Sequence, residues 1–498
     1  MPIWPLINFY MWPNFYICTM EKIIGRETEI GIMGDLLKSK SAELLAVYGR
    51  RRVGKTFLIY TYFRDQLVFE LTGIKNGSLK EQLQLFSLAL QKASGSALAL
   101  KPPANWIEAF DALARYLATK NPKTRSVVFL DELPWLDGRK SGFLSAFEHF
   151  WNSWANRQPG LLVVVCGSAA SWMIRNITQA TGGLHNRITQ KIVLKPFSLS
   201  ETDLYLKSRG SKLDHYQVLQ IYMAFGGIPH YLKTVGKNNS ATQAIDKTCF
   251  SKDGLLTEEF ENLYSSLFDA TDHHITIVRI LAANGKGMSR QQLIEASGLP
   301  SGGRISKALD ELEKSGFIQQ TIPFDKNTYE GIYRLIDEFS IFYLKFMDKG
   351  KAVSTKSWSA LATSQTYPIW CGIAFEAVCF KHVAKIKEGL KIKVGTEESV
   401  WRYVPPKGSK EKGAQIDLIV DRADRIINLC EMKFYTTEFV IDKSYAQRLM
   451  QKKEVFIEHV KPKKTIFQTM ITTFGVKEND YFDEHIQQSL TMEVLFKP

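Results

Sequence analysis

The chain has 498 residues, of which 45% are hydrophobic and 23% are charged. These proportions are typical of an ordinary soluble globular protein, and they exclude a disordered, collagen-like or membrane-embedded chain. The length predicts about three folded units. Lysine and arginine exceed aspartate and glutamate, which gives the chain a net charge of +13. This charge favours polyanionic partners such as nucleic acid, nucleotide phosphates or an anionic membrane surface.

The first twenty residues contain three prolines and no charged residue. We interpret residues 1–20 as a disordered leader, with Met20 as an alternative start; a membrane anchor is the alternative interpretation. The six cysteines are scattered without a C-x-x-C pair, so neither disulfides nor a zinc site is predicted. These features together favour a cytoplasmic protein with no membrane partner.

Short apolar runs alternate with amphipathic stretches between residues 21 and 196. The clearest runs are Leu44–Tyr48, Ser126–Leu130 and Leu161–Cys166, and all three are apolar throughout. Such runs are typical of strands that are buried on both faces of a parallel sheet. The pattern therefore predicts an α/β fold with a parallel sheet for residues 21–196.

A phosphate-binding motif follows the first of these runs. Residues 49–56 read G-R-R-R-V-G-K-T and match the pattern G-x-x-x-x-G-K-[ST] between a predicted strand and a predicted helix. The loop amides would hold phosphates, Lys55 would bridge the outer phosphates and Thr56 would bind Mg²⁺. We therefore expect ATP and Mg²⁺ as ligands. The predicted contacts are Gly49, Arg50, Arg51, Arg52, Val53, Gly54, Lys55 and Thr56.

The apolar strand at residues 126–130 ends in two carboxylates. Asp131 would bind the metal ion, mostly through water, and Glu132 would activate the attacking water. An isolated pair of this kind is also compatible with a solvated loop start. Ser168 could sense the γ-phosphate and Arg187 could neutralise charge, with an ordinary turn and a structural ion pair as the respective alternatives. For the three loop arginines, salt bridges or solvation are alternatives to a catalytic role.

Residues 197–265 have helical patterning, which predicts a helical lid domain. Residues 266–348 have the order helix, helix, turn, helix, strand that is typical of a winged helix. The predicted helices are Thr276–Ala283, Ser289–Ala296 and Arg304–Ser315, followed by the run Phe317-Ile318. Arg304, Ser306 and Lys307 would begin the recognition helix, but acidic residues follow them, so DNA contact and structural packing both stay open.

We interpret residues 349–365 as a linker and residues 366–498 as a last αβ domain. Two apolar strands at 413–421 and 426–434 predict a hairpin. Residues two apart on a strand project to the same face, so Glu431 and Lys433 would share a face that Asp417 could reach from the partner strand.

This combination of charges suits phosphodiester hydrolysis. Asp417 and Glu431 would hold Mg²⁺, with Glu376 as a further ligand, and Lys433 would orient the water or neutralise the phosphate. Residues 381–412 carry nine basic and four acidic side chains, which favours DNA as a partner, although a solvated surface explains the charge equally well.

Several of these motifs together resemble the archaeal-type AAA ATPases, which are relatives of the STAND signalling NTPases. The resemblance spans about residues 20–345 and rests on Ile24-Gly25-Arg26-Glu27, the loop at 49–56, the Leu-Asp-Glu at 130–132 and Gly227-Ile228-Pro229. It implies that Ile24, Gly25, Arg26 and Pro229 lie next to the nucleotide. No clear arginine finger is evident, so self-association stays open.

The segment from about Tyr367 to Phe496 resembles the restriction-endonuclease-like fold, whose motif is (P)D…(D/E)-x-K, and the domain that is often fused behind such ATPases. Ile416 stands where the motif has its proline. The resulting hypothesis is an ATP-binding, ATP-hydrolysing protein with a DNA-directed, Mg²⁺-dependent nuclease-like module. The alternative is a STAND-like regulatory NTPase switch whose C-terminal domains bind DNA or protein without cleavage.

Overall fold

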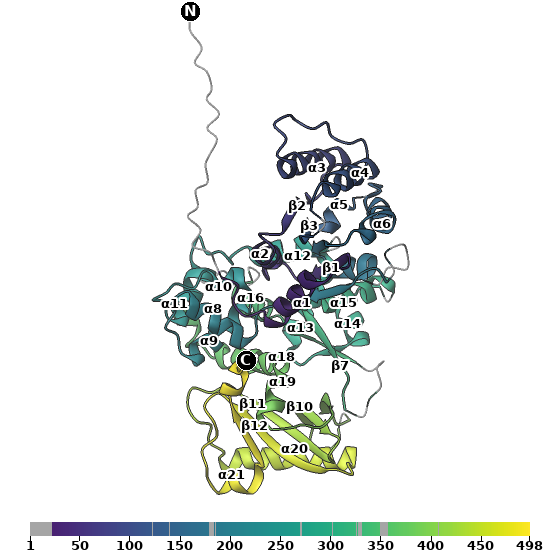
Figure 1. Ribbon diagram of the computed structural model, residues 1–498. Coiled ribbons are helices and arrows are strands. Elements are labelled where there is room, and N and C mark those ends of the chain that lie inside the picture. Colours follow the sequence, from purple (N-terminus) through teal and green to yellow (C-terminus); the bar gives the residue numbers. More distant parts are fainter. Residues whose placement is uncertain are drawn as a thin grey trace, which may run out of the picture.

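The computed structural model of the protein is shown in Figure 1. It describes residues 22–121, 123–138, 140–178, 184, 186–268, 271–300, 302–324, 326, 331–348, 357–406 and 408–498. The predicted leader at residues 1–20 and residues 349–356 of the predicted linker lie outside the described residues.

The N-terminal part is built on a five-stranded sheet with the order β2-β3-β4-β1-β5. Its strands are β1 (Glu43–Tyr48), β2 (Leu67–Thr72), β3 (Ser126–Asp131), β4 (Leu161–Gly167) and β5 (Gln190–Val193). All neighbouring strands are parallel, so the predicted α/β fold with a parallel sheet is confirmed. Because β4 lies between β1 and β3, the segments that follow these three strands meet at one edge of the sheet.

Helices cover both faces of this sheet. They are α1 (Glu27–Lys38), α2 (Lys55–Tyr62), α3 (Leu79–Ser94), α4 (Trp106–Ala118), α5 (Leu133–Leu136), α6 (Phe143–Ser153), the 3₁₀ turn Ala155–Arg157, α7 (Ala170–Met173) and the π turn Ile174–Thr178. Helix α3 begins at Ser78, which forms a capping box with Glu81. Helices α4 and α6 pack through aromatic rings, with Trp106 and Phe143 edge to face at 4.9 Å between ring centroids.

A helical segment follows the first sheet. It contains α8 (Leu199–Ser208), α9 (His215–Phe225), α10 (Pro229–Leu232), α11 (Ala241–Ile245), the π turn Asp246–Phe250 and α12 (Glu259–Leu267). Ser198 caps α8 and Asp214 caps α9 through their side chains, which explains where both helices begin.

The next segment combines three helices with a small antiparallel sheet of order β6-β8-β7. Its elements are α13 (Thr271–Asn284), β6 (Met288–Ser289), α14 (Arg290–Ser297), α15 (Gly303–Lys314), β7 (Ile318–Thr321), β8 (Ile332–Leu335) and α16 (Glu338–Phe346). The predicted helices agree with α13, α14 and α15, except that α13 begins five residues earlier, at Thr271. Helix α15 packs against α7 of the first sheet, and Arg175 lies 3.6 Å from Glu311 there.

Part of the predicted linker is packed rather than extended over the surface. Helix α17 (Trp358–Leu361) buries Trp358, which is 3% exposed. Its ring lies within about 6 Å of the rings of Phe250, Phe342, Phe346 and Trp370. A buried aromatic residue of this size stabilises its segment against the core, which a composition rich in Lys, Ser and Thr did not reveal.

A second five-stranded sheet, with the order β13-β12-β11-β10-β9, forms the C-terminal part. Its elements are α18 (Thr366–Lys381), α19 (Val383–Gly389), β9 (Thr396–Tyr403), β10 (Ala414–Arg422), β11 (Ile426–Lys433), α20 (Lys443–Val460), β12 (Thr465–Thr472), α21 (Asp480–His485), β13 (Gln488–Thr491) and the 3₁₀ helix Met492–Phe496. Strands β10 and β11 form the predicted antiparallel hairpin, whereas β12 is parallel to β11 after the α20 crossover.

The two sheets lie at opposite ends of the molecule with the helical segments between them (Figure 1). One continuous apolar core nevertheless runs from Met33 beneath the first sheet to Phe496 at the end of the chain. Among the residues that the structure describes, no helix has the length and apolar character needed to cross a bilayer.

Candidate active sites

The loop at residues 49–54 connects β1 to α2, where the motif predicted a phosphate site. Gly49 has a φ of +154°, and a Cβ atom there would come within 2.2 Å of the carbonyl oxygen of Leu194, so only glycine fits. Lys55 is 5% exposed, and its Nζ donates to the carbonyl oxygens of Gly49 and Arg50 at 3.0 Å each. The lysine therefore lies back over its own loop.

The two predicted acids lie beside this loop. The hydroxyl of Thr56 donates to Oδ2 of Asp131 at 2.7 Å, and Asp131 is 4% exposed. The backbone N–H of Glu132 donates to Oδ1 of Asp131 at 2.9 Å, and Glu132 takes a left-handed backbone conformation with a φ of +46°. A strained backbone at this position fixes the direction of the Glu132 side chain.

Ser168 connects the lysine to the second acid. Its hydroxyl donates to Oε1 of Glu132 at 2.6 Å and accepts from Nζ of Lys55 at 3.1 Å. Its backbone N–H donates to Oε2 of Glu132 at 3.2 Å. The structure thus brings together five predicted residues from the start of α2 and the ends of β3 and β4, and it gives Ser168 a place in the cluster beyond that of a turn residue.

The loop arginines form ion pairs with distant segments. The buried guanidinium of Arg50 pairs with Asp337, which caps α16, and lies 4.5 Å from the ring centroid of Phe317. Burial acts to raise the pKa of Asp337, but the charge of Arg50 outweighs it and holds that pKa below its usual range. The salt-bridge interpretation of Arg50 therefore fits its contacts.

Arg52 lies 2.5 Å from Oε2 of Glu259 on α12. Tyr231 donates to the other oxygen of the same carboxylate at 2.6 Å. Burial raises the pKa of Glu259, although Tyr231, Arg52 and Arg51 act in the opposite direction. Tyr231 belongs to α10, which begins at Pro229. The predicted segment Gly227-Ile228-Pro229 is therefore connected to the loop through Tyr231, Glu259 and Arg52.

Arg26, which directly follows Ile24 and Gly25, contacts the loop. The guanidinium of Arg26 donates to the carbonyl oxygen of Val53 at 3.4 Å and lies 4.5 Å from the ring centroid of Phe197. Its backbone N–H donates to Oε1 of Glu201 at 3.1 Å. By contrast, Arg187 is exposed, and no contact among the described residues joins it to the loop.

The second cluster lies on the C-terminal hairpin. Leu418 of β10 pairs with Cys430 of β11, which places Asp417 and Glu431 side by side across the two strands. Asp417 is 5% and Glu431 is 8% exposed. Nζ of Lys433 lies 2.7 Å from Oε1 of Glu431, so the predicted Asp, Glu and Lys converge.

Burial and mutual repulsion hold part of this cluster in its protonated form. Burial, with the charge of Asp417 as the next cause, raises the pKa of Glu376 to about 8. Burial and then Glu431 raise the pKa of Asp417 to about 6. Burial also opposes ionisation of Glu431, but Lys433 and Lys452 outweigh it, and the pKa of Glu431 is lowered.

Two residues of α20 complete the cluster, and sequence reasoning missed both. Nζ of Lys452 lies 2.7 Å from Oε2 of Glu431, and the hydroxyl of Tyr445 donates to Oε1 at 3.2 Å. Both lie on one long helix, whose contact with the hairpin no local pattern reveals. Among the described residues, no group of three or more His, Cys, Asp and Glu side chains is arranged to hold a metal ion. At the hairpin, a lysine Nζ lies 2.7 Å from each oxygen of Glu431.

Residues 23–235 match the family described as an ATPase domain predominantly from Archaea. The match supports an archaeal-type ATPase domain in this part of the chain. An uncharacterized protein of Methanocaldococcus jannaschii is 22% identical over 404 residues, which are 80% of this chain and 83% of that protein.

Two solved structures are similar over 65% of this chain. The Walker-type ATPase of Pyrococcus abyssi is 20% identical, is covered over 97% of its length and gives a TM-score of 0.48. The ORC2 protein of Aeropyrum pernix, in its ADPNP-ADP complexes, is 15% identical, is covered over 93% and gives a TM-score of 0.44.

Proposed function

We propose that the protein binds and hydrolyses ATP with Mg²⁺ at residues 49–56, and that this ATPase is coupled to a DNA-directed, Mg²⁺-dependent nuclease-like module. The observation that carries the ATPase assignment is the connected set Lys55–Ser168–Glu132 beside Thr56–Asp131. It lies within the residues that match the ATPase family. A lysine, a hydroxyl and two carboxylates at one sheet edge are the groups that phosphoryl transfer to water requires.

Each residue of this set has a role in the proposed reaction. Lys55 would exchange its contacts with loop carbonyls for phosphate oxygens, which hold its charge more strongly. The hydroxyl of Thr56 and the carboxylate of Asp131 are hard oxygen ligands that fit Mg²⁺, which when bound neutralises phosphate charge. Glu132 would accept the proton of the attacking water, with its carboxylate oriented by Ser168.

Two ion pairs connect the loop to helix α18, which carries Glu376 of the C-terminal cluster. Asp337 pairs with Arg50 of the loop, and the next residue, Glu338, lies 2.7 Å from Nζ of Lys381. Lys381 is the last residue of α18, the helix that also carries Glu376. A change at the loop on nucleotide binding would therefore act on the helix that covers the acid cluster, and we propose this as the route by which nucleotide state gates the second module.

The arrangement of the C-terminal part supports a restriction-endonuclease-like module. An antiparallel meander of three strands is followed by the α20 crossover and a parallel fourth strand. Asp417 lies on the second strand of the meander, and Glu431 and Lys433 lie on the third. In the proposed reaction Asp417 and Glu431 would hold Mg²⁺ and Lys433 would orient water.

We also propose that residues 266–348 form a winged-helix domain, which is supported by the order of α13, α14, α15 and the three-stranded sheet. Arg304 and Lys307 on α15 are exposed, which leaves phosphate contacts open to them. Glu311 of the same helix lies 3.0 Å from His274 and 3.6 Å from Arg175. Because Arg175 belongs to the ATPase part, this second contact favours packing against that part for the face of α15 that carries Glu311.

A regulatory switch without cleavage is the second candidate function. The observation that favours it is the pairing of Glu431 with Lys433 and Lys452, which neutralises the carboxylate that a metal ion would need. In this case the acid cluster stabilises a domain that binds DNA or protein. Its activity would then reside in nucleotide-dependent exposure of that surface.

The ATPase assignment is tested with Lys55→Ala. We expect phosphate release to fall to background while the circular dichroism spectrum is unchanged, because Lys55 would contact the outer phosphates. Arg64→Ala, at an exposed position outside the loop, is the control that should keep wild-type turnover. Unchanged turnover in Lys55→Ala would refute the assignment.

The nuclease assignment is tested by incubating the full-length protein with plasmid and Mg²⁺, with and without ATP. We expect cleavage by the wild type and none by Lys433→Ala or Glu431→Ala. Retention of DNA without cleavage would favour the regulatory switch. Cleavage that persists in both variants would mean that the hairpin acids are not the active site.

A further inference from the structure

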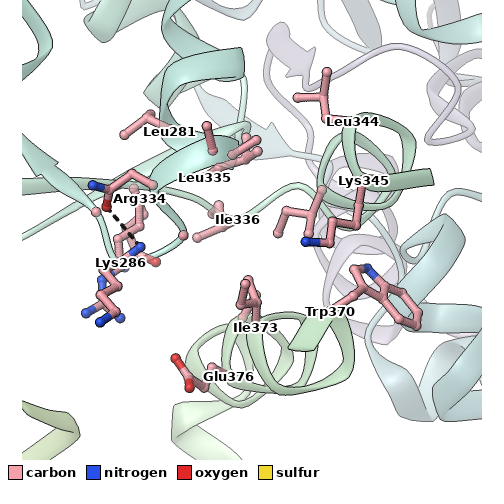
Figure 2. Close-up of a pocket in the computed structure, with 18 of the residues that line it drawn as sticks. Leu281, Lys286, Arg334, Leu335, Ile336, Leu344, Lys345, Trp370, Ile373 and Glu376 are labelled. Carbon is pink, nitrogen blue, oxygen red and sulfur yellow. Dashed lines mark hydrogen bonds between the residues drawn. The ribbon is translucent and has the colours of Figure 1, made fainter. Parts of the chain in front are cut away.

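A cavity of about 690 Å³ lies between the winged-helix segment and the C-terminal module. Its walls come from the end of α13, strands β7 and β8, helix α16 and helix α18 (Figure 2). This volume falls in the range of roughly 300–1,000 Å³ that binds small ligands. Glu376 and Gln415 are part of the lining, and Nε2 of Gln415 donates to Asp417 at 3.4 Å. The cavity therefore adjoins the acid cluster.

Basic side chains surround this cavity. Figure 2 shows Arg334 and Lys286 on one side and Lys345 on the other, with Glu376 on α18 below them. Arg279 also lines it but pairs with Asp348. Within the described part of the chain, no salt bridge neutralises Lys286, Arg334 or Lys345. The cavity thus presents three basic side chains beside the carboxyl group of Glu376.

Two buried donors at this cavity have no acceptor among the described residues. One is Nε of Arg334, whose guanidinium carbon lies 5.3 Å from the ring centroid of Phe380. The other is Nε1 of Trp370, a residue that is 1% exposed. A buried N–H without a partner is costly, so an acceptor that reached Arg334 from the cavity would be stabilised there, whereas the Trp370 ring packs against Phe342, Phe346 and Trp358.

The turn before β6 is built tightly against this wall. Gly287 has a φ of +85°, and a Cβ atom there would come within 2.6 Å of Ile332 and 2.7 Å of Arg334. The backbone N–H of Lys286 donates to Oδ1 of Asn284 at 3.1 Å. These contacts hold the backbone of Lys286 at the cavity next to the stem of Arg334.

We propose that this cavity binds one nucleotide unit, with its phosphate on Arg334, Lys286 and Lys345 and its base against the apolar wall that includes Ile373. The unit is either the end of a nucleic-acid strand or a free nucleotide, and both supply the same phosphate and base. This inference rests on the proposed nuclease-like function only for its consequence, which is that Arg334 places a strand end next to Glu376 and Asp417. Arg334 is then a positioning residue contributed by the neighbouring segment.

The binding test uses the full-length protein and a 5′-labelled single-stranded decamer, in EDTA and without ATP, so that no cleavage occurs. Fluorescence polarisation is measured over a range of salt concentrations. We expect Arg334→Gln and Lys286→Gln each to weaken binding about tenfold or more, since hydrogen bonds to charged groups are strong. Each should also reduce the slope of log affinity against log salt by about 0.7, the value for one lost phosphate contact on a single strand.

Matched variants separate this role from a structural one. Arg334→Lys keeps the charge and should recover part of the affinity, whereas Arg64→Gln, at an exposed site of the ATPase part, should behave as wild type. Lys286 is exposed, so its variant should fold normally even if Arg334→Gln does not. Wild-type affinity and salt slope in a folded Lys286→Gln and a folded Arg334→Lys, together with wild-type affinity in any folded Arg334→Gln, would overturn the proposal.

The two sources of the ligand are distinguished by competition in the Lys55→Ala background, which removes the loop as a nucleotide site. Displacement of the decamer by AMP with Arg334-dependent affinity identifies a free nucleotide, and displacement only by unlabelled strand identifies a strand end; each supports the cavity. Measuring cleavage and binding in the same samples separates the nuclease assignment from the cavity proposal. Arg334-dependent binding without cleavage in the wild type would refute only the nuclease assignment, and cleavage with Arg334-independent binding would refute only the cavity site.

Discussion

The phosphate-binding loop and the C-terminal acid cluster each place a lysine near carboxylates at a sheet, but they differ in what neutralises the charges. Lys55 contacts two carbonyl oxygens and a hydroxyl, and the carboxylates of Asp131 and Glu132 accept from neutral donors. In the C-terminal cluster, Glu431 is paired with Lys433 and with Lys452.

This difference has a chemical consequence. Lys55, Asp131 and Glu132 contact only neutral groups among the described residues, whereas Arg50 and Arg52 of the loop are paired with distant carboxylates. An anionic ligand and a metal ion therefore meet one lysine and two carboxylates that are ready to bind them. At the C-terminal cluster, a metal ion must first displace lysines and deprotonate buried acids. We therefore expect the loop to act as a binding site as it stands, and the acid cluster to act only after a rearrangement.

The largest expected effect concerns the loop at residues 49–56 and the acids beside it, which we expect to bind ligands as they stand. Glu132→Gln should lower ATP turnover by about 10²–10⁴-fold, because an amide cannot accept the proton of the attacking water. ATP binding, measured with a fluorescent nucleotide, should remain close to wild type. The control is Glu454→Gln, at an exposed position on α20. Full turnover in Glu132→Gln would remove Glu132 from the reaction and leave the loop as a binding site alone.

The second effect tests the ion pair that joins the loop to the start of helix α16. Arg50→Ala leaves Asp337 buried without its partner, and the loss of one partner of a buried ion pair costs about 3–5 kcal/mol in the free energy of unfolding. Arg51→Ala, in the same loop and less buried, should change it by about 0.5 kcal/mol or less. Urea unfolding measures both, and equal effects would contradict the structural role of Arg50.

The third effect is a pH dependence that belongs to the acid cluster. The folded-state pKa is about 8 for Glu376 and about 6 for Asp417, above the values of roughly 4 for the unfolded chain. The folded protein thus keeps protons that the unfolded chain releases, so the free energy of unfolding contributed by these groups falls as pH rises from about 4 to about 8.

Glu376→Gln removes the larger of these titrations. The variant should lose less stability than the wild type between pH 6 and pH 8, by on the order of 2 kcal/mol, which urea midpoints across this range would measure. Glu478→Gln, at an exposed position, is the matched control. Parallel curves for wild type and Glu376→Gln would mean that this carboxyl group is ionised throughout.

The smallest effect sharpens the description of the loop. Ser168→Ala removes the hydroxyl that joins Lys55 to Glu132 but leaves both charges in place. We expect turnover to fall about tenfold, equivalent to about 1.4 kcal/mol, since only orientation is lost. Ser168→Thr keeps a hydroxyl and should recover part of the turnover. A loss as large as that of Glu132→Gln would give Ser168 a direct role instead.

Some parts of this molecule follow from local sequence. The loop at 49–56, the strands that end at Tyr48 and Asp131 and the hairpin that holds Glu431 were all predictable, because strand periodicity and glycine placement act over a few residues. The strand order could not be read in this way. Only the folded sheet shows that β4 lies between β1 and β3 and brings Ser168 to the lysine.

The sequence by itself determined which residues are candidates for chemistry, since Lys55, Asp131 and Glu431 are recognisable from their neighbours along the chain. The tertiary structure alone decided their partners. Arg50 meets Asp337, which is 287 residues away, and Glu431 meets Lys452 on a separate helix. Such pairings depend on how helices and sheets pack, because the residues next to a charged side chain in the sequence do not indicate which distant group will neutralise it.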